Sequence, residues 1–302
     1  MVNVPTKYAI TALVLMLAAT SPAVAGDGLS FQRESESPRT LSKPHDIVLS
    51  RSGRYLLAAD LGNDAIQVLD PLTLKIVSSF GKDILNSPHD VAVARDGRVL
   101  VADTANNRIA VFRFMGVGAH GKSRVSLLAS WSDGIDWPEG VDAGPDGRVY
   151  VGNVGSHSVA ILKDGRVVKR VGGPGNLPLE FSRPHDVEVT ADGRVIVVDS
   201  GNNRLQILDL DLNLVKVLAG APYNFHEPKY VALDTEGRLY VADEYNSQVK
   251  IFDRDYAPVA FIGSGQQGDG PGQLNWPEGV FVDGTRIWIS DTYNDRILRY
   301  RR

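Results

Sequence analysis

The sequence contains no cysteine, and its only long apolar stretch lies close to the N-terminus. Without cysteine the chain has no disulfide bonds, so its stability must come from packing alone. The 32 basic residues are scattered along the chain and are outnumbered by 36 acidic residues. A phosphate-binding surface needs a concentrated basic face, so we expect no nucleic-acid partner.

The apolar stretch reads YAITALVLMLAA over residues 8–19, which is too short to cross a bilayer as a helix. Lys7 is the only charged residue among the first 25, and Ala23-Val24-Ala25 is a small-x-small cleavage site. We therefore predict a secretory signal peptide over residues 1–25, cut after Ala25, and one mature domain over residues 26–302 without a membrane span. The periplasm is the expected location, with full secretion as the alternative.

A sequence unit recurs six times along the rest of the chain. Each copy holds Pro-x-x-Val, a tight turn such as Asp-Gly-Arg, and a Val-rich run that ends in Asp or Asn. The anchoring prolines lie 44 to 50 residues apart, at Pro44, Pro88, Pro138, Pro184, Pro228 and Pro277. This period is typical of a four-stranded propeller blade.

The local chemistry of each copy is all β. Residues 91–103, VAVARDGRVLVAD, predict a strand, an Asp-Gly turn and a second strand, and residues 108–112 and 125–131 predict the third and fourth. We therefore predict an all-β, six-bladed β-propeller of four-stranded antiparallel blades. The sixth copy ends after its third strand, so residues 28–36 are predicted to form its outer strand and close the ring.

The residue after each repeated proline is ionisable. These positions hold His45, His89, Glu139, His185, Lys229 and Glu278. The first strand of a propeller blade is innermost, so the six side chains are predicted to ring one mouth of the central channel. Buried charges cost several kcal/mol unless they are paired, which favours a binding site over a packing device. We expect a small molecule, a peptide or a protein to bind a monomer there.

Alternate blades meet on the axis, and blades two, four and six supply His89, His185 and Glu278. Two histidines and a carboxylate form a recognised catalytic zinc set, so these three residues are the predicted ligands of a divalent metal, zinc above others. The remaining three, His45, Glu139 and Lys229, are predicted to contact the ligand. A polar lining held by ordered water is the alternative for the whole ring.

Other polar positions are expected to be structural. The Asp that ends the second strand and the Asn three residues later are predicted to hydrogen-bond the turn backbone. Asp46, Asp90 and Asp186 are expected to cap the start of the first strand, with orientation of the imidazoles as the alternative. The glycine-rich residues 263–273 open no helix, so they are expected to connect blades and not to hold phosphate.

The repeat resembles the NHL family, whose signature runs Pro-x-Gly-Val-Ala-Val, Asp-x-x-Gly, Val-Tyr-Val-Ala-Asp and Asn-x-Arg-Ile, from Ser42 to Arg302. The resemblance implies a six-bladed propeller that displays a binding surface. The Pro-His motifs that end at His45, His89 and His185 also resemble peptidyl-α-hydroxyglycine α-amidating lyases, in which three histidines bind a metal. This second resemblance implies a metal-dependent lyase as the alternative function, with Tyr245 as its catalytic residue.

Overall fold

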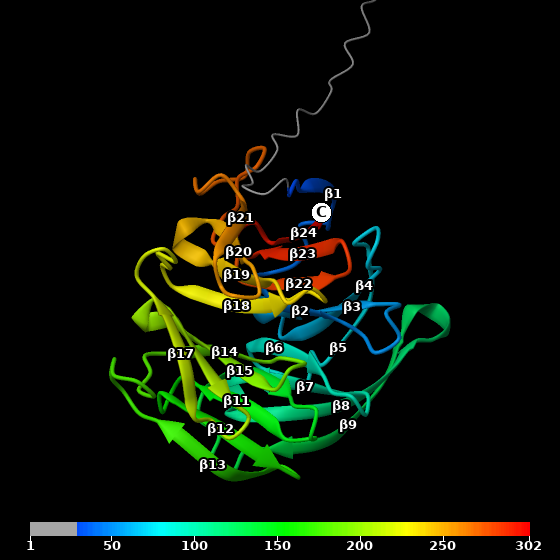
Figure 1. Ribbon diagram of the computed structural model, residues 1–302. Coiled ribbons are helices and arrows are strands. Elements are labelled where there is room, and N and C mark those ends of the chain that lie inside the picture. Colours follow the sequence, from blue (N-terminus) through cyan, green and yellow to red (C-terminus); the bar gives the residue numbers. More distant parts are fainter. Residues whose placement is uncertain (1–28) are drawn as a thin grey trace, which may run out of the picture.

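The computed structural model describes residues 29–302, so the predicted signal peptide lies outside the described residues. Six four-stranded antiparallel sheets form the described part of the chain (Figure 1), which confirms the predicted propeller. In blades one to five each strand pairs with the next one along the chain, and the innermost strands line a central cavity. Within residues 29–302, no helix is long and apolar enough to cross a membrane.

The strands of the first three blades follow the six repeats in order. Blade one comprises β2 (Pro44–Leu49), β3 (Leu56–Asp60), β4 (Ala65–Leu69) and β5 (Ile76–Phe80). Blade two comprises β6 (Pro88–Val93), β7 (Arg98–Asp103), β8 (Arg108–Val117) and β9 (Ser123–Trp131). Blade three comprises β10 (Pro138–Ala143), β11 (Val149–Asn153), β12 (Ser158–Lys163) and β13 (Arg166–Gly172).

The other three blades complete the ring. Blade four comprises β14 (Pro184–Val189), β15 (Arg194–Asp199), β16 (Arg204–Asp209) and β17 (Leu214–Ala219). Blade five comprises β18 (Pro228–Leu233), β19 (Leu239–Asp243), β20 (Gln248–Phe252) and β21 (Pro258–Ile262). Blade six comprises β22 (Val280–Asp283), β23 (Arg286–Asp291), β24 (Arg296–Arg301) and β1 (Gln32–Glu36). Short 3₁₀ turns span Leu61–Asn63, Thr104–Asn106, Ala119–Gly121, Ser200–Asn202, Glu244–Asn246 and Thr292–Asn294.

The hydrophobic core lies between blades. One cluster joins Leu57 and Val68 of blade one to Val91, Val101 and Phe112 of blade two. Both faces of a blade are therefore buried, which explains the Val-rich runs without strict alternation. A single blade could not bury these faces alone, so closure of the ring is a condition of stability.

The ring closes with an N-terminal strand, as predicted. β1 pairs with β24 as the outer strand of blade six, so the two ends of the described chain lie side by side (Figure 1). Phe31, 5% exposed, enters the core cluster between blades five and six, and Glu34 Oε2 lies 3.0 Å from Arg299 Nη2. Backbone pairing, one aromatic anchor and ion pairs hold the closure together.

The Asp and Asn that recur at the end of the second strand have structural roles, and their main partner is the backbone of the loop that enters the blade. Asp60 Oδ1 accepts the backbone N–H of Ser42 at 2.7 Å, and Asn63 Nδ2 donates to Asp60 Oδ2 at 2.8 Å. The same first bond recurs at Asp103, Asn153, Asp199, Asp243 and Asp291. This carboxylate or amide thus fixes the loop that enters each blade and positions the residues that follow it.

Candidate ligand site at the channel mouth

The six ionisable residues that follow the repeated prolines converge at one end of the channel. His45 Nε2 lies 3.1 Å from Glu278 Oε2, which joins blades one and six. His185 Nε2 lies 3.4 Å from Glu139 Oε2 and 3.8 Å from Glu278 Oε2. His89 Nε2 lies 3.7 Å from Glu139 Oε1, and the His45 and His89 ring centroids are 4.8 Å apart.

These contacts cross between the two sets of alternate blades. Within the predicted metal set, His185 approaches Glu278, but the carboxylate beside His89 belongs to Glu139. The histidine nearest to Glu278 is His45, which was expected to contact the ligand. The structure therefore gathers one cluster of three imidazoles and two carboxylates, and the two sets do not form separate layers.

Two of the ring histidines have a fixed tautomer. His45 Nδ1 lies 2.9 Å from the Lys43 carbonyl oxygen, and His89 Nδ1 lies 3.0 Å from that of Ser87. A carbonyl oxygen only accepts, so both Nδ1 atoms carry the proton and both Nε2 atoms of the neutral rings present a lone pair. His185 Nδ1 is buried and has no hydrogen-bond partner within residues 29–302.

Burial sets the charge of the ring. It lowers the pKa of His45 to about 4 and that of His89 to about 4, and holds the pKa of His185 well below 6.5. It also raises the pKa of Glu139, and that of Glu278 to about 7. At neutral pH the imidazoles are therefore uncharged, and Glu278 is poised between its acid and its carboxylate form.

Lys229 is held on the other side of the ring by acidic residues. Its Nζ lies 3.1 Å from Glu244 Oε2 and 3.6 Å from Glu227 Oε2. Burial disfavours its charge, but Glu278 and Glu244 outweigh burial, and the pKa of Lys229 lies above its usual value. Lys229 thus stays charged and paired next to the imidazoles.

Tyr230, which the sequence analysis did not single out, lies across the channel beneath the ring. From blade five its hydroxyl donates toward the His89 carbonyl at 3.0 Å and the Glu139 carbonyl at 3.2 Å, in blades two and three. Its ring packs edge-on against His185 with centroids 4.9 Å apart. The only sequence signal was a tyrosine where other copies have Asp or Gly. Tyr230 therefore covers the inner side of the ring of ionisable residues.

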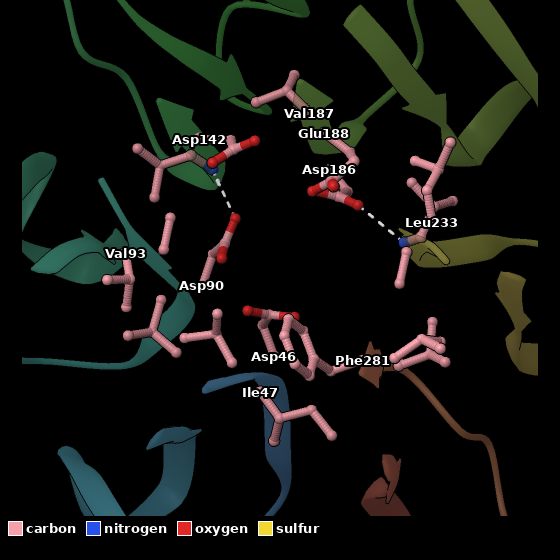
Figure 2. Close-up of a pocket in the computed structure, with 18 residues that line it drawn as sticks. Asp46, Ile47, Asp90, Val93, Asp142, Asp186, Val187, Glu188, Leu233 and Phe281 are labelled. Atoms are coloured by element: carbon pink, nitrogen blue, oxygen red, sulfur yellow. Dashed lines mark hydrogen bonds between the residues drawn. The ribbon is translucent and has the colours of Figure 1, made fainter. Parts of the chain in front are cut away.

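Further along the axis, past Tyr230, lies a cavity of about 200 Å³ that is lined by the inner strands of all six blades (Figure 2). Its acidic lining residues are Asp46, Asp90, Asp142, Asp186 and Glu188, and none of its lining residues is basic. Burial, followed by repulsion between neighbouring carboxyls, raises the pKa of Asp46, Asp90 and Asp186 well above 3.8. This cluster was not expected from the sequence.

Among the aspartates that were expected to cap their own strands, Asp90 and Asp186 also accept hydrogen bonds from the next blade. Asp90 Oδ2 accepts the N–H of Val141 in the next blade at 2.6 Å, and Asp186 Oδ2 accepts that of Val231 at 2.9 Å (Figure 2). In blades one to five a β-bulge after the repeated proline shifts the register of the innermost strand. Since the bulge breaks the usual alternation of side chains, the histidine and the next aspartate both face the channel.

An aromatic wall borders the mouth on blades five and six. Successive ring centroids of His226, Tyr245, Trp276 and Tyr293 are 5.0, 5.3 and 4.7 Å apart. Tyr245 and Tyr293 occupy the position after Glu244 and Thr292 in their turns, where blades one and four hold Gly62 and Gly201. Tyr245 is 41% exposed, and Glu244 and partial burial raise its pKa.

The donor types of the ring suit a metal ion, because imidazole nitrogens and carboxylate oxygens are common zinc ligands. Among residues 29–302, however, no group of three or more His, Asp or Glu side chains is positioned to hold a metal ion. In the structure these nitrogen and oxygen atoms pair with one another. A metal would have to separate these pairs and take their place.

Comparison with known proteins identifies the repeat. The family model for the NHL repeat matches residues 85–112, 181–208 and 225–252. The chain carries NHL repeats. No curated protein sequence matches it.

Solved structures similar to this NHL-repeat propeller share its fold at low identity. Hydrazine synthase of Kuenenia stuttgartiensis is 15% identical with a TM-score of 0.61, over 87% of this chain and 96% of that one. Virginiamycin B lyase of Staphylococcus aureus is 14% identical with a TM-score of 0.60, over 90% and 99%. An auxiliary nutrient binding protein of Bacteroides thetaiotaomicron is 14% identical with a TM-score of 0.64, over 87% and 70%.

Proposed function

We propose that this NHL-repeat propeller is a secreted or periplasmic binding module that holds a divalent metal ion or a small cationic ligand in the His/Glu ring. One observation carries the proposal. His45 Nε2 and Glu278 Oε2 face each other at 3.1 Å, while the His45 Nδ1 proton is already donated to the Lys43 carbonyl. Two acceptors at this distance need a shared proton or a bound cation between them.

The surroundings of the ring favour a small occupant. His45, His185 and Glu278 are 6%, 5% and 3% exposed, so a peptide chain has little access to them, but an ion or a small polar group does. The aromatic wall adds a flat surface on one side that suits the organic part of a ligand. One neighbour in fold is described as an auxiliary nutrient binding protein, which is in keeping with small-ligand binding by this architecture.

A metal-dependent lyase is the second candidate. It is favoured by the contiguity of the three Pro-His histidines, whose ring centroids lie 4.8 Å apart for His45 and His89 and 6.3 Å apart for His89 and His185. Tyr245 would be its catalytic residue, on the rim of the same mouth. This function requires the metal, so an experiment that excludes the metal excludes it too.

Zinc binding tests the proposal. We expect the purified protein to bind one Zn²⁺ ion per chain with micromolar affinity or better, measured by titration calorimetry and elemental analysis. His185→Ala and Glu278→Gln should each weaken binding at least tenfold, because each removes a donor from a small ligand set. Affinity should rise with pH through about 7, since Glu278 must lose its proton to ligate.

The matched control is His120→Ala, which removes a histidine from the hairpin between the two outer strands of blade two, whereas the ring residues lie at the innermost strands. Its zinc affinity should equal that of the unaltered protein. Lys229→Ala should bind zinc as well or better, because it removes a positive charge from the ring. If no zinc binds at micromolar concentrations and no metal is present after growth with added zinc, the ring is a proton-bridged polar lining and the metal proposal fails.

A further inference from the structure

The outer hairpin of blade two is longer than that of any other blade. β8 has 10 residues and β9 has 9, whereas the third and fourth strands of the other blades have 5 to 7. The extra residues project beyond the neighbouring strands (Figure 1) and reach back to blade one. Ser123 Oγ donates to Ser78 Oγ at 2.8 Å, and the rings of Phe114 and Tyr55 pack edge to face at 5.7 Å.

A cleft of about 570 Å³ lies between this hairpin and the first turn of blade one. Tyr55, Val93, Val99, Phe114 and Val117 supply its apolar lining. Its charged lining residues are all arginines, namely Arg51, Arg54 and Arg124, and no acidic residue lines it. The cleft is thus amphipathic and positive in a chain whose net charge is −4.

Arg54 is unpaired where blade one departs from the repeat. The equivalent turn pairs its arginine with its own carboxylate in blades two, three and five, as in Arg98 Nε to Asp96 Oδ2 at 2.6 Å. Blade one has Ser52 where those turns have Asp or Glu. Within residues 29–302, the side chains of Arg51 and Arg54 form no ion pair and no hydrogen bond. Ser52, which replaces the usual carboxylate, and the long hairpin therefore line the same cleft.

The other groups fix the shape of the cleft. Arg124 Nη2 donates to the Met115 carbonyl at 2.8 Å, so one guanidinium is held on the hairpin. The N–H of Val117 donates to the Tyr55 hydroxyl at 3.4 Å, which ties the hairpin to blade one. The turn of blade one follows the end of β2, whereas the His/Glu ring lies at the start of β2. The cleft is therefore at the other end of the channel strands from the proposed metal site.

We propose that this cleft binds a small amphipathic anion, with a phosphate or carboxylate held by Arg51 and Arg54 and an aromatic or alkyl part held by Tyr55 and Phe114. Guanidinium groups form paired, charge-assisted hydrogen bonds with phosphate and carboxylate oxygens. The volume falls in the range of about 300 to 1,000 Å³ that is usual for small-molecule pockets. Binding here does not depend on the function of the mouth.

Titration calorimetry with 1-naphthyl phosphate tests the site, with 1-naphthol as the neutral probe. We expect the phosphate to bind at least tenfold more tightly than the naphthol, and its affinity to fall as sodium chloride is raised from about 0.05 to 0.5 M, because salt screens exposed charges. The double variant Arg51→Gln and Arg54→Gln should lower affinity at least tenfold. Ser52→Asp should do the same, since it restores the carboxylate that pairs the equivalent arginines.

The matched control is Arg148→Gln in blade three, which removes the equivalent arginine from a turn outside the cleft. It should leave the affinity for naphthyl phosphate unchanged, and thermal melting should show all variants folded. Equal binding of phosphate and naphthol, or unchanged affinity in the folded double variant or in Ser52→Asp, would overturn the proposal. Failure of zinc to bind at the mouth would leave it intact.

Discussion

The residue before each repeated proline has a left-handed backbone in all six blades. These residues, with φ between 49° and 53°, are Lys43, Ser87, Trp137, Arg183, Glu227 and Trp276. Such a conformation costs a non-glycine residue about 1–3 kcal/mol, and it is compensated by contacts with the preceding blade. Lys43 N–H donates to Asp295 Oδ1 at 2.9 Å, and Ser87 N–H to Asp64 Oδ1 at 2.8 Å. The strain thus positions the ring residue that lies two places further on.

In blades two, four and six, the Asp that ends the second strand pairs with an arginine five positions later. Arg204 Nε donates to Asp199 Oδ2 at 2.6 Å, and Arg296 Nε to Asp291 Oδ2 at 2.7 Å. Blade three has Asn153 in place of the acid and Ser158 in place of the arginine, and no charge is buried there. Blade three therefore has neither the carboxylate nor its arginine partner.

Asp199→Asn should lower the free energy of unfolding by about 3 kcal/mol, because Arg204, 8% exposed, keeps its buried charge without a counter-ion. The amide oxygen can still accept the Ser182 N–H. The new NH2 group, however, would face the donors of Asn202 and Gln206, so the loss includes these hydrogen bonds as well as the ion pair. Asp199→Asn combined with Arg204→Ser, the pair found in blade three, should cost less than the sum of the two single changes by about 2 kcal/mol in urea unfolding. Additive costs would show that the pair contributes nothing.

The innermost strands bring carboxyl groups into a cavity that holds no basic side chain. The pKa of Asp142 is raised to about 6 by burial, and the pKa of Glu188 is well above 4.5 because of burial and then Asp142. A group whose pKa is higher in the folded than in the unfolded chain binds its proton more tightly when folded. Its contribution is complete below the unfolded pKa and is lost as the pH rises through the folded pKa.

The protein should therefore be less stable at pH 8.5 than at pH 6.5, by urea unfolding. Carboxyls such as Glu278 and Glu244, both with pKa about 7, lose protons across this window. The ring histidines oppose this trend, because their pKa is lowered and the unfolded chain binds protons at pH 6.5 that the folded chain does not, but they are outnumbered by the carboxyls with raised pKa. Asp90→Asn should raise stability at pH 8.5, since the amide oxygen still accepts the Val141 N–H without a charge. As the control, Asp96→Asn, which lies on an exposed turn, should give no gain in stability at pH 8.5. Stability that is flat or rises with pH would contradict the prediction.

The whole molecule depends on one non-local closure. Every blade buries its faces against its neighbours, but only blade six is assembled from both ends of the described chain. β1 covers β24, and Arg296 Nη1 lies 3.2 Å from Glu36 Oε2, across 260 positions of the sequence. Closing a loop between such distant segments costs only slightly more conformational entropy than closing a shorter loop, since the cost grows logarithmically with loop length.

Deletion of residues 29–36 should lower the melting temperature by more than 10 °C or cause aggregation, because it exposes the edge of β24 and uncovers the core around Phe31. Phe31→Ala keeps the backbone pairing and should cost about 3 kcal/mol for the cavity alone. Size-exclusion chromatography and thermal melting separate the two effects. A melting curve of the deletion variant that matches the unaltered protein would show that closure by β1 is dispensable.

The sequence by itself determined the fold. Its period, its Asp-Gly turns and its Val-rich runs are local signals, and only a closed ring of blades buries the faces that they predict. The convergence of His45, His89, Glu139, His185, Lys229 and Glu278 followed from the same logic, since equivalent positions in a propeller lie around one axis.

Only the tertiary structure decided which of these residues meet. The bulge after the proline in blades one to five breaks the alternation that a sequence pattern assumes, so Asp46, Asp90 and Asp186 reach the cavity. Asp90 and Asp186 also link consecutive blades. Tyr230 reaches across the axis to the carbonyl groups of His89 and Glu139. Gly140 and Gly279 let neighbouring inner strands approach closely, since a Cβ there would lie 2.8 and 2.2 Å from backbone atoms of the next blade. Pairings across the axis and between blades depend on distances between segments far apart in the chain, and no local pattern encodes those distances.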